Sequence, residues 1–173
     1  MILLTGASGF LGQHIYKIFS PVFPMIGLGY SGSNCDRKID LTDLEALEAL
    51  LDEVKPDTII HSAAIRDPDE CVRRPETARI LHVDATKVMA EWCKLNGKRL
   101  VYISTDYVFN GKNPPYNEKA APDPVNLYGE TKLMGEKEAQ KMPRSSYRQD
   151  RLAVRHHRPA GAQLHTQGHQ NAL

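Results

Sequence analysis

Several features that mark other classes of protein are absent from this chain of 173 residues. Its three cysteines, Cys35, Cys71 and Cys93, are scattered, without a C-x-x-C pair or the spacing of a metal site. We therefore expect no bound metal, and an odd number of free thiols fits a reducing compartment. The chain also lacks an apolar run long enough to cross a bilayer, and its N-terminus lacks the basic region of a signal peptide. These absences predict a cytoplasmic protein with no membrane association.

A strong charge of either sign is absent too, because the formal net charge is +1. The charge is nevertheless uneven. Residues 1–142 hold 17 Lys and Arg against 20 Asp and Glu, whereas residues 143–173 hold five Arg against Asp150 alone. A basic tail can bind nucleic acid, but residues 1–142 offer no basic face to join it, so nucleic acid is not an expected partner. The hydrophobic share of 41% and the charged share of 25% are typical of a soluble globular domain.

What the chain does contain is an alternation of apolar runs and helical patterns. Short apolar or β-branched runs predict strands at residues 1–4, 25–28, 58–61 and 100–103. Apolar residues at helical spacing predict helices at residues 10–19, 42–54, 75–97 and 127–141. The second helix is expected to begin with a capping box, Thr42-x-x-Glu45. This alternation predicts right-handed βαβ units, and therefore an α/β fold with a doubly wound parallel sheet of the Rossmann type.

The first predicted strand runs into a glycine-rich turn, Thr5-Gly6-Ala7-Ser8-Gly9-Phe10-Leu11-Gly12, ahead of the first predicted helix. The N–H groups and the dipole of a helix N-terminus favour an anion such as a pyrophosphate. Glycine permits the tight turn, the close approach of backbone to phosphate and the packing of helix on strand. The pattern predicts a dinucleotide site formed by Gly6, Ser8, Gly9, Phe10, Leu11 and Gly12, with a plain glycine turn as the alternative.

The residues after the second predicted strand indicate which dinucleotide binds. An acidic residue there would bond the 2′-hydroxyl of the adenosine ribose and favour NAD(H). The chain instead continues with residues 29–33, Gly-Tyr-Ser-Gly-Ser, and has no acid before Asp36, which precedes Arg37 and Lys38. Small polar residues with cations nearby suit a 2′-phosphate, so we expect NADP(H) in preference to NAD(H).

Two side chains with acid–base chemistry, Tyr128 and Lys132, stand four residues apart and so share one face of a helix. A neighbouring ammonium and a bound nicotinamide cation would favour the phenolate, which would make the tyrosine an acid–base catalyst near neutral pH. Lys132 could also hold the nicotinamide ribose. A solvated helix face is the alternative for a lone pair of this kind.

Residues 104–107, Ser-Thr-Asp-Tyr, directly follow the strand at 100–103. They are therefore expected at the carboxyl ends of the strands, where open α/β sheets bind ligands. A hydroxyl there can donate to a substrate carbonyl oxygen that gains negative charge during hydride attack. A helix cap or a turn is the alternative role for such a hydroxyl.

Taken in order along the chain, these features resemble the extended short-chain dehydrogenase/reductases. The residues that carry the resemblance are Gly6, Gly9, Gly12, Asp40-Leu41, Ala63-Ala64, Ser104–Phe109 and Tyr128-x-x-x-Lys132. Further segments at residues 114–116, 126–129 and 135–137 make the chain similar to the dTDP-4-dehydrorhamnose reductases. It also resembles relatives of those enzymes, the regulatory beta subunits of methionine adenosyltransferase. The resemblance covers residues 1 to about 142.

The resemblance implies NADPH-dependent reduction of the 4-keto group of a nucleotide-activated deoxysugar. Tyr128 would then donate the proton with Lys132 as its partner, and both would contact the cofactor. Thr105 would polarise the keto group, with Asp106 also at the substrate. The residues implied to flank the adenine and its ribose are Asp40, Leu41, Ala63 and Ala64.

Two departures from the reductase pattern keep a second function open. His82 stands where the family usually has an asparagine beside the active-site helix. Residues 66–69, Arg-Asp-Pro-Asp, are closer to the regulatory subunits than to the enzymes. The alternative function is therefore a non-catalytic NADP-binding regulatory subunit that docks on a partner enzyme. A homodimer is the other assembly that the sequence leaves as an alternative.

The composition changes after Met142. Residues 143–173 contain four of the seven His, no Lys and few large aliphatic side chains, too little to offset the entropy of ordering. A frame change, a genuine basic tail and a histidine metal site are the three interpretations, and the abrupt exchange of Lys for Arg favours the first. We expect a Rossmann domain at residues 1–142 that is truncated before the last strands and the substrate lobe of the family, because the strand at 100–103 is the last convincing one. Residues 143–173 are expected to form a disordered or frame-shifted tail. On this interpretation the chain is an inactive fragment of a reductase.

Overall fold

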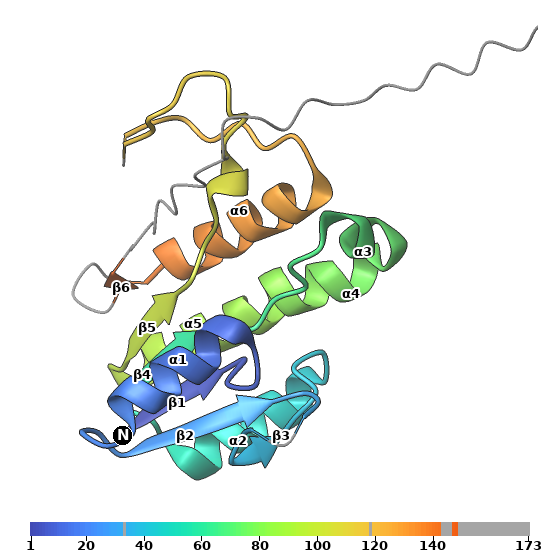
Figure 1. The fold of residues 1–173 in the computed structure, drawn as a ribbon. Coiled ribbons are helices and arrows are strands. Elements are labelled where there is room, and N and C mark those ends of the chain that lie inside the picture. The colour runs from blue at the N-terminus through green and yellow to red at the C-terminus, as the bar shows by residue number, and fades with distance from the viewer. Residues whose placement is uncertain (33, 118, 143–146, 149–173) are drawn as a thin grey trace, which may run out of the picture.

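A computed structural model describes residues 1–32, 34–117, 119–142 and 147–148. They form one sheet of six parallel strands in the order β3-β2-β1-β4-β5-β6 (Figure 1). The strands are β1 (Ile2–Thr5), β2 (Met25–Gly29), β3 (Arg37–Lys38), β4 (Thr58–His61), β5 (Arg99–Tyr102) and β6 (Tyr147–Arg148). Because β1 and β4 are neighbours at the centre, this is the strand order of a Rossmann-type sheet. The predicted fold class is confirmed.

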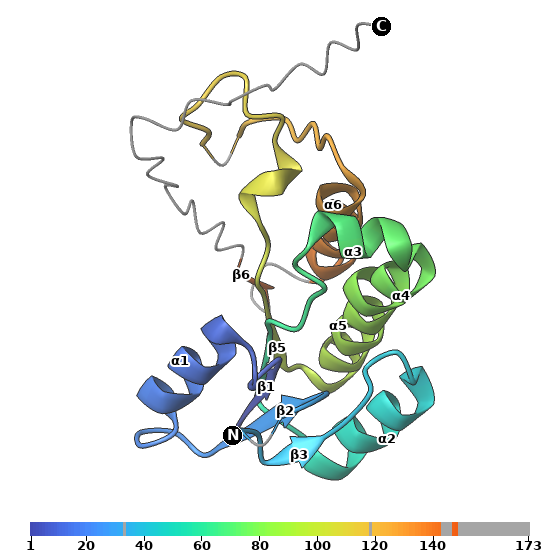
Figure 2. The same ribbon diagram turned by 45° about the vertical axis from the view of Figure 1, so that its right-hand side comes forward.

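Helices cover both faces of the sheet. Figure 2 shows α1 on one face, with α2, α5 and α6 on the other. The helices are α1 (Phe10–Phe19), α2 (Leu44–Val54), α3 (Pro68–Arg73), α4 (Pro75–Arg79), α5 (Ala85–Asn96) and α6 (Leu127–Gln140). A π-helical turn, η1 (Ile80–Asp84), links α4 to α5, and a 3-10 turn, η2 (Asp106–Val108), follows β5.

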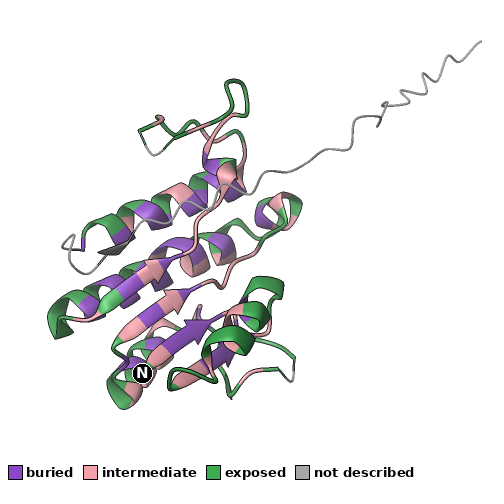
Figure 3. Cartoon of the chain, turned by 60° about the vertical axis from the view of Figure 1, so that its left-hand side comes forward, coloured by how far each residue is buried: buried purple, intermediate pink, exposed green. Residues whose placement is uncertain are grey.

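The core lies between the sheet and the helices α2 and α5. Leu3, Ile59 and Leu100 project from neighbouring strands into it, where they belong to one buried cluster with Leu51 and Met89. Figure 3 shows the buried positions concentrated along the strands and the inner faces of the helices. Each fully buried side chain of this size contributes roughly 1.5–3 kcal/mol, so this packing fixes the strand ends on which the site is built.

The predicted strands and helices are present with small shifts at their ends, apart from the helix predicted at 75–97, which is divided. In η1 the Ala85 N–H bonds to the Ile80 carbonyl, one residue further back than in an α-helix. Gly97 ends α5 in the left-handed conformation, with φ 63°. The short helix α3 was not predicted, because six residues carry too little periodicity. Its N-cap, Asp67, accepts a hydrogen bond from the Asp69 N–H.

The capping box expected at the start of α2 is wrong by one residue. Asp43 is the N-cap, and its carboxylate accepts a hydrogen bond from the Ala46 N–H at 3.0 Å. Thr42 instead donates its hydroxyl to the Asp40 carboxylate at 2.7 Å. Aspartate and threonine are both favoured at the N-cap of a helix. Where the two are adjacent, the sequence alone does not determine which one caps the helix.

The prediction that the strand at 100–103 is the last one is also wrong. β6 pairs in parallel with β5, with Tyr147 opposite Leu100 and Arg148 opposite Val101. A two-residue edge strand is held by backbone hydrogen bonds and needs no apolar run, which is why the composition concealed it. The interpretations of the remaining residues after Met142 lie outside the described residues. Within the part that the structure describes, no helix is long and apolar enough to span a membrane.

Candidate functional site

A cavity of about 300 Å³ opens at the carboxyl ends of the central strands. Its walls come from the segments that follow β1, β2 and β4, together with residues 39–42 and parts of the helical segment 74–81. Because β1 lies between β2 and β4, the cavity is located where the winding of the sheet reverses. This switch point is where open α/β sheets bind their ligands.

The segment after β1 forms one wall, and close backbone contacts shape it. Gly6 has a φ of 70°, which a residue with a side chain rarely adopts. A Cβ on Gly12 would overlap the Gly6 carbonyl oxygen, so α1 approaches the turn more closely than a side chain would permit. Gly9 is the N-cap of α1 and makes no side-chain cap. The N–H groups of the first turn are therefore left for solvent or an anion.

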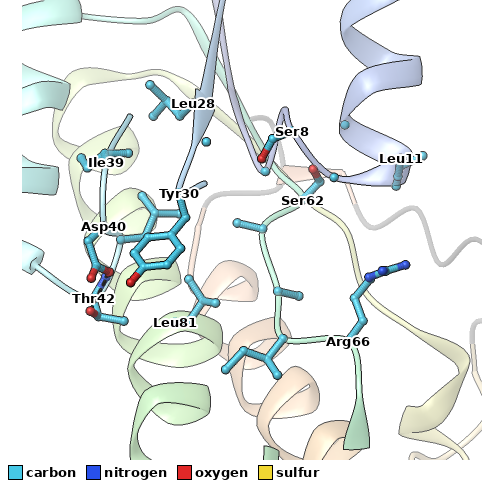
Figure 4. Close-up of a pocket in the computed structure, with 18 of the residues that line it drawn as sticks. Ser8, Leu11, Leu28, Tyr30, Ile39, Asp40, Thr42, Ser62, Arg66 and Leu81 are labelled. Carbon is cyan, nitrogen blue, oxygen red and sulfur yellow. Dashed lines mark hydrogen bonds between the residues drawn. The ribbon is translucent and has the colours of Figure 1, made fainter. Parts of the chain in front are cut away.

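The opposite wall follows β2 and β3. Figure 4 shows Tyr30, Asp40 and Thr42 grouped on one side of the cavity, near Leu81. The Asp40 carboxylate accepts hydrogen bonds from the Thr42 N–H at 2.9 Å and from the Thr42 hydroxyl at 2.7 Å, which fixes its orientation. An aromatic ring, aliphatic surface and an oriented acceptor together suit a ligand with a planar, amine-bearing base.

Positive charge exceeds negative charge on the cavity wall. Asp40 is the only acid among the described residues that line the cavity, whereas Arg66 and Arg74 both line it. Asp36, the first acid after β2, is not part of the lining. Its carboxylate accepts hydrogen bonds from the Tyr16 hydroxyl at 2.9 Å and from a β2 N–H at 2.7 Å. The cavity is therefore suited to a ligand that carries several negative charges.

Tyr128 is at the start of α6 and is buried against two other rings. Its ring centroid lies 5.5 Å from that of Tyr107 and 5.8 Å from that of His82, with interplanar angles of 71° and 76°. Burial raises the pKa of the Tyr128 phenol, and a hydrogen bond from the Thr105 side chain opposes the rise. The phenol is therefore protonated near neutral pH, which is the form that can donate a proton.

Lys132 lies one turn later on the same face of α6, with 2% of its surface exposed. Its Nζ donates a hydrogen bond to the Ile103 carbonyl at 2.6 Å and lies 4.1 Å from the centre of the Tyr102 ring. Burial lowers the pKa of Lys132 to about 7, against the opposing charge of Glu136. The charge of Lys132 is therefore sensitive to any ion that binds nearby.

Thr105 and Asp106 lie just beyond β5, beside Tyr128. The Thr105 hydroxyl caps η2 by accepting a hydrogen bond from the Tyr107 N–H at 3.2 Å, and its predicted contact with a substrate carbonyl stays a prediction. As a donor it bonds the Asp106 carboxylate at 3.2 Å. The hydroxyl also interacts with the Tyr128 phenol, and its single proton can go to only one of these acceptors at a time.

The predicted site residues fall into two groups. The first group lines the cavity and consists of Gly6, Ser8, Gly9, Phe10, Leu11, Gly12, Asp40, Leu41, Ala63 and Ala64. The second group lies on the first turns of α6 or beside them and is not part of the lining. It consists of Thr105, Asp106, Tyr128 and Lys132. The contact of Tyr128 and Lys132 with a cofactor therefore stays a prediction.

Sequence reasoning missed part of the cavity wall. The residues that it did not assign to the site are Leu28, Gly29, Tyr30, Ile39, Thr42, Ser62, Ile65, Arg66, Arg74, Thr77 and Leu81. Some of them directly flank predicted site residues along the chain, and adjacency could have identified them. Thr77 and Leu81 come from a helical segment that no local pattern links to the cavity.

The comparison with protein families decides the assignment of the chain. A family model described as the RmlD substrate binding domain matches residues 1–155. The chain belongs to the RmlD substrate-binding domain family. The part of the chain that matches the RmlD family model extends past Met142 and includes β6.

Relatives of this RmlD-family chain include two kinds of protein. The methionine adenosyltransferase 2 subunit beta of Xenopus tropicalis is 44% identical over 137 residues, which are 78% of this chain and 41% of the relative. The dTDP-4-dehydrorhamnose reductase of Salmonella typhimurium is 33% identical over 141 residues, which are 80% of this chain and 46% of the relative. The chain thus spans less than half the length of these curated relatives.

A solved structure shares the fold of this RmlD-family chain. It is the dTDP-4-dehydrorhamnose reductase of Bacillus anthracis in complex with NADP, with a TM-score of 0.74 and 30% identity. The alignment covers 84% of this chain and 50% of that one. The predicted resemblance to these reductases is confirmed.

Proposed function

We propose that residues 1–142 form a domain that binds a nicotinamide dinucleotide in the cavity at the switch point. The observation that carries this proposal is the cavity itself, because the glycine-rich turn, Asp40-Leu41 and Ala63-Ala64 line one space although they are distant in sequence. The turn fits a pyrophosphate, since Gly6 and Gly12 let the turn pack directly against the Ala63 backbone and the start of α1, whose first N–H groups have no side-chain cap. Asp40, Leu41, Ala63 and Ala64 would flank the adenosine.

NADP(H) is the preferred form. Two arginines against one aspartate on the wall favour the ligand with the additional phosphate. Asp36 is engaged by Tyr16 and a β2 N–H, so it is not available to bond a ribose 2′-hydroxyl. The NADP in the Bacillus anthracis relative agrees with this preference.

The reaction that we propose is the reduction of the 4-keto group of a nucleotide-activated deoxysugar. A reduced nicotinamide supplies a hydride when it is bound. Tyr128, protonated at neutral pH by the effect of burial on its pKa, gives its proton to the former carbonyl oxygen. Thr105 donates a hydrogen bond to the same oxygen, and Asp106 contacts the substrate.

Lys132 completes the acid–base group. It is one helical turn from Tyr128, and it carries its charge on an Nζ held by the Ile103 carbonyl. An ammonium there stabilises the phenolate that remains after proton donation, and its pKa of about 7 rises as that anion forms. Lys132 and Tyr128 are also expected to contact the nicotinamide ribose.

The test compares a full-length relative rebuilt around this sequence with its Tyr128→Phe variant, because the 173-residue chain itself is expected to have little or no activity. NADPH oxidation that depends on a dTDP-4-keto-deoxysugar is expected for the rebuilt protein and is expected to disappear in the variant, while NADPH affinity stays the same. The phenol gives a proton but does not hold the pyrophosphate. Equal oxidation rates in the two proteins would contradict the role of Tyr128. The same assay on the 173-residue chain tests the expectation that this chain is inactive, and tight NADPH binding without oxidation by the rebuilt protein would leave only the binding part of the proposal.

A second candidate is a non-catalytic NADP-binding subunit that docks on a partner enzyme. The observation in its favour is the identity of 44% to the methionine adenosyltransferase 2 subunit beta, against 33% to the Salmonella typhimurium reductase. NADPH binding without oxidation, together with co-elution with a methionine adenosyltransferase catalytic subunit in size-exclusion chromatography, would favour this candidate over the reductase.

A further inference from the structure

His82 occupies a buried position between the cavity and α6. Its side chain is fully buried on the π-helical turn η1. Nε2 accepts a hydrogen bond from the Ile65 N–H at 3.0 Å, and Nδ1 lies 2.8 Å from the Thr131 hydroxyl oxygen. Because a backbone N–H can only donate, Nε2 must be the unprotonated nitrogen. The proton is therefore on Nδ1, which donates to the Thr131 hydroxyl, and the ring is neutral.

The two partners of His82 belong to different parts of the candidate site. Ile65 is part of the cavity lining. Thr131 lies between Tyr128 and Lys132 on α6, and its hydroxyl is within hydrogen-bonding distance of the Leu127 carbonyl, at 2.9 Å, and of the Tyr128 carbonyl, at 3.0 Å. The ring thus joins the cavity wall to the turn of helix that carries the predicted proton donor, across separations of 17 and 49 residues along the chain. We call this connection the Ile65–His82–Thr131 bridge.

The backbone around the bridge leaves little freedom for α6. The Thr86 hydroxyl donates to the His82 carbonyl at 2.8 Å, which steadies the π-helical turn. A Cβ on Gly135 would overlap that same carbonyl oxygen and would also meet the Tyr102 hydroxyl, so η1 and α6 are in direct backbone contact. η1, which carries His82, and α6 are therefore already packed together, and the two hydrogen bonds of His82 add side-chain contacts from η1 to α6 and to the cavity wall.

We propose that His82 is a positioning residue that holds the Tyr128 phenol in register with the dinucleotide cavity through the Ile65–His82–Thr131 bridge. This inference rests on the proposed function, because it assumes that the cavity holds the dinucleotide and that Tyr128 donates the proton. His82 contacts neither the substrate nor the reacting atoms in this account. It acts through Thr131.

The bridge requires the neutral ring, because a proton on Nε2 would face the Ile65 N–H. Three titratable groups act on the ring: Tyr128 is in ring contact with it, the charge of Lys132 lowers its pKa, and His61 is electrostatically coupled to it. Burial lowers the pKa of His82 to about 3, with a further contribution from Lys132. The bridge is therefore intact throughout the neutral pH range.

Two substitutions each remove one half of the bridge. An asparagine amide can occupy the place of Nδ1, so His82→Asn retains the contact with Thr131 and loses the one with Ile65. A glutamine amide can occupy the place of Nε2, so His82→Gln retains Ile65 and loses Thr131. Thr131→Val leaves the ring in place and removes its acceptor, which provides a variant with an unchanged histidine. His14→Asn on the surface of α1 is the matched control, because α1 lies on the opposite face of the sheet from α6 and the His14 side chain contacts the carbonyl and the ring of Phe10.

The measurement is NMR of the 173-residue chain with ¹³C-labelled tyrosine and ¹⁵N-labelled histidine, with NADPH titration and oxidation assays alongside. We expect the Nδ1–H tautomer at His82 and a single Tyr128 signal, identified by its loss in Tyr128→Phe. In the two His82 variants and in Thr131→Val, NADPH affinity should stay within about threefold. The Tyr128 signal should broaden or split. Any sugar-dependent oxidation should fall in kcat rather than KM by on the order of tenfold or more, because a small displacement of a catalytic group is costly.

The outcomes separate this inference from the function on which it rests. The Nε2–H tautomer at His82, or an unchanged Tyr128 signal in all three bridge variants, overturns the positioning role. A Tyr128 signal that changes equally in His14→Asn also overturns it. Failure of the unsubstituted chain to bind NADPH overturns the proposed function instead, whereas the tautomer and the Tyr128 signal of the ligand-free chain still test the bridge.

Discussion

The glycines of the turn after β1 differ in how tightly the structure packs around them. A Cβ on Gly12 would overlap the Gly6 carbonyl oxygen, whereas a Cβ on Gly9 would meet that oxygen at 3.2 Å, which a small adjustment can relieve. We expect Gly12→Ala to push α1 away from the turn and to weaken NADPH binding by at least about tenfold, through loss of charge-assisted bonds to the pyrophosphate. Gly9→Ala should have a clearly smaller effect. Calorimetric titration of both variants measures the difference, and equal losses would argue against a pyrophosphate at the start of α1.

A second residue-scale prediction concerns the buried His61. Burial, with electrostatic coupling to Lys132 and His82, lowers the pKa of His61 to about 3. In the unfolded chain a histidine titrates near pH 6.5, so between about pH 6.5 and pH 3 the unfolded state binds a proton that the folded state does not. The stability that His61 contributes is therefore present above pH 6.5 and is lost as the pH falls toward 3. His61→Asn should reduce the fall in the free energy of unfolding between about pH 7 and pH 5, as measured by urea denaturation. An unchanged difference between the two pH values would contradict the neutral, buried state of this ring.

At this scale the sequence predicted the cavity better than the acid–base group. The glycine-rich turn and the Asp40-Leu41 pair were found because their chemistry depends on residues adjacent in sequence, and all of them line the cavity. The contacts of Lys132 with the Ile103 carbonyl and the Tyr102 ring depend on where β5 lies beside α6. The role of His82 as a link could not be predicted either, because both of its partners are distant in sequence.

Among the elements, the start of α2 separates a capping role from a binding role. Asp43 caps the helix, whereas Thr42 lines the cavity and orients the Asp40 carboxylate. We expect Asp43→Ala to lower the free energy of unfolding by about 1 kcal/mol. Thr42→Ala should lower it by less than about 0.5 kcal/mol but should weaken NADPH binding. Urea denaturation and NADPH titration of the two variants provide the measurement. If Thr42→Ala instead lowered the free energy of unfolding by more than Asp43→Ala does, the capping box predicted from the sequence would be the correct one.

The elements that were predicted have long apolar periods or β-branched runs, and those that were missed are short. α3 spans six residues and β6 two, too few for a period to appear. The π-helical turn inside the helix predicted at 75–97 has the apolar pattern of its neighbours and differs only by a shift in hydrogen bonding. Sequence patterns thus located the main layers of the fold, whereas short edge and turn elements depend on tertiary contacts.

For the whole molecule, the strand order brings the site together. Reversal of the winding between β1 and β4 places the turns after β1, β2 and β4 around one cavity, which no single segment of the chain could form. The alternation of strands and helices predicted a doubly wound parallel sheet of this type, because right-handed βαβ units restrict the possible topologies. Membership in the RmlD substrate-binding domain family agrees with the fold. The boundary at residue 142 stays a prediction, and the family match continues to residue 155.

The central claim is that the cavity at the switch point binds NADP(H). The most direct test is a titration of the 173-residue chain with NADPH and, in parallel, with NADH, followed by the fluorescence of the reduced nicotinamide or by calorimetry. The account predicts saturable binding of NADPH and an affinity for NADH that is lower by about tenfold or more, since only NADPH offers a 2′-phosphate to the arginines of the wall. Equal affinities, a preference for NADH, or no binding of either dinucleotide would contradict it.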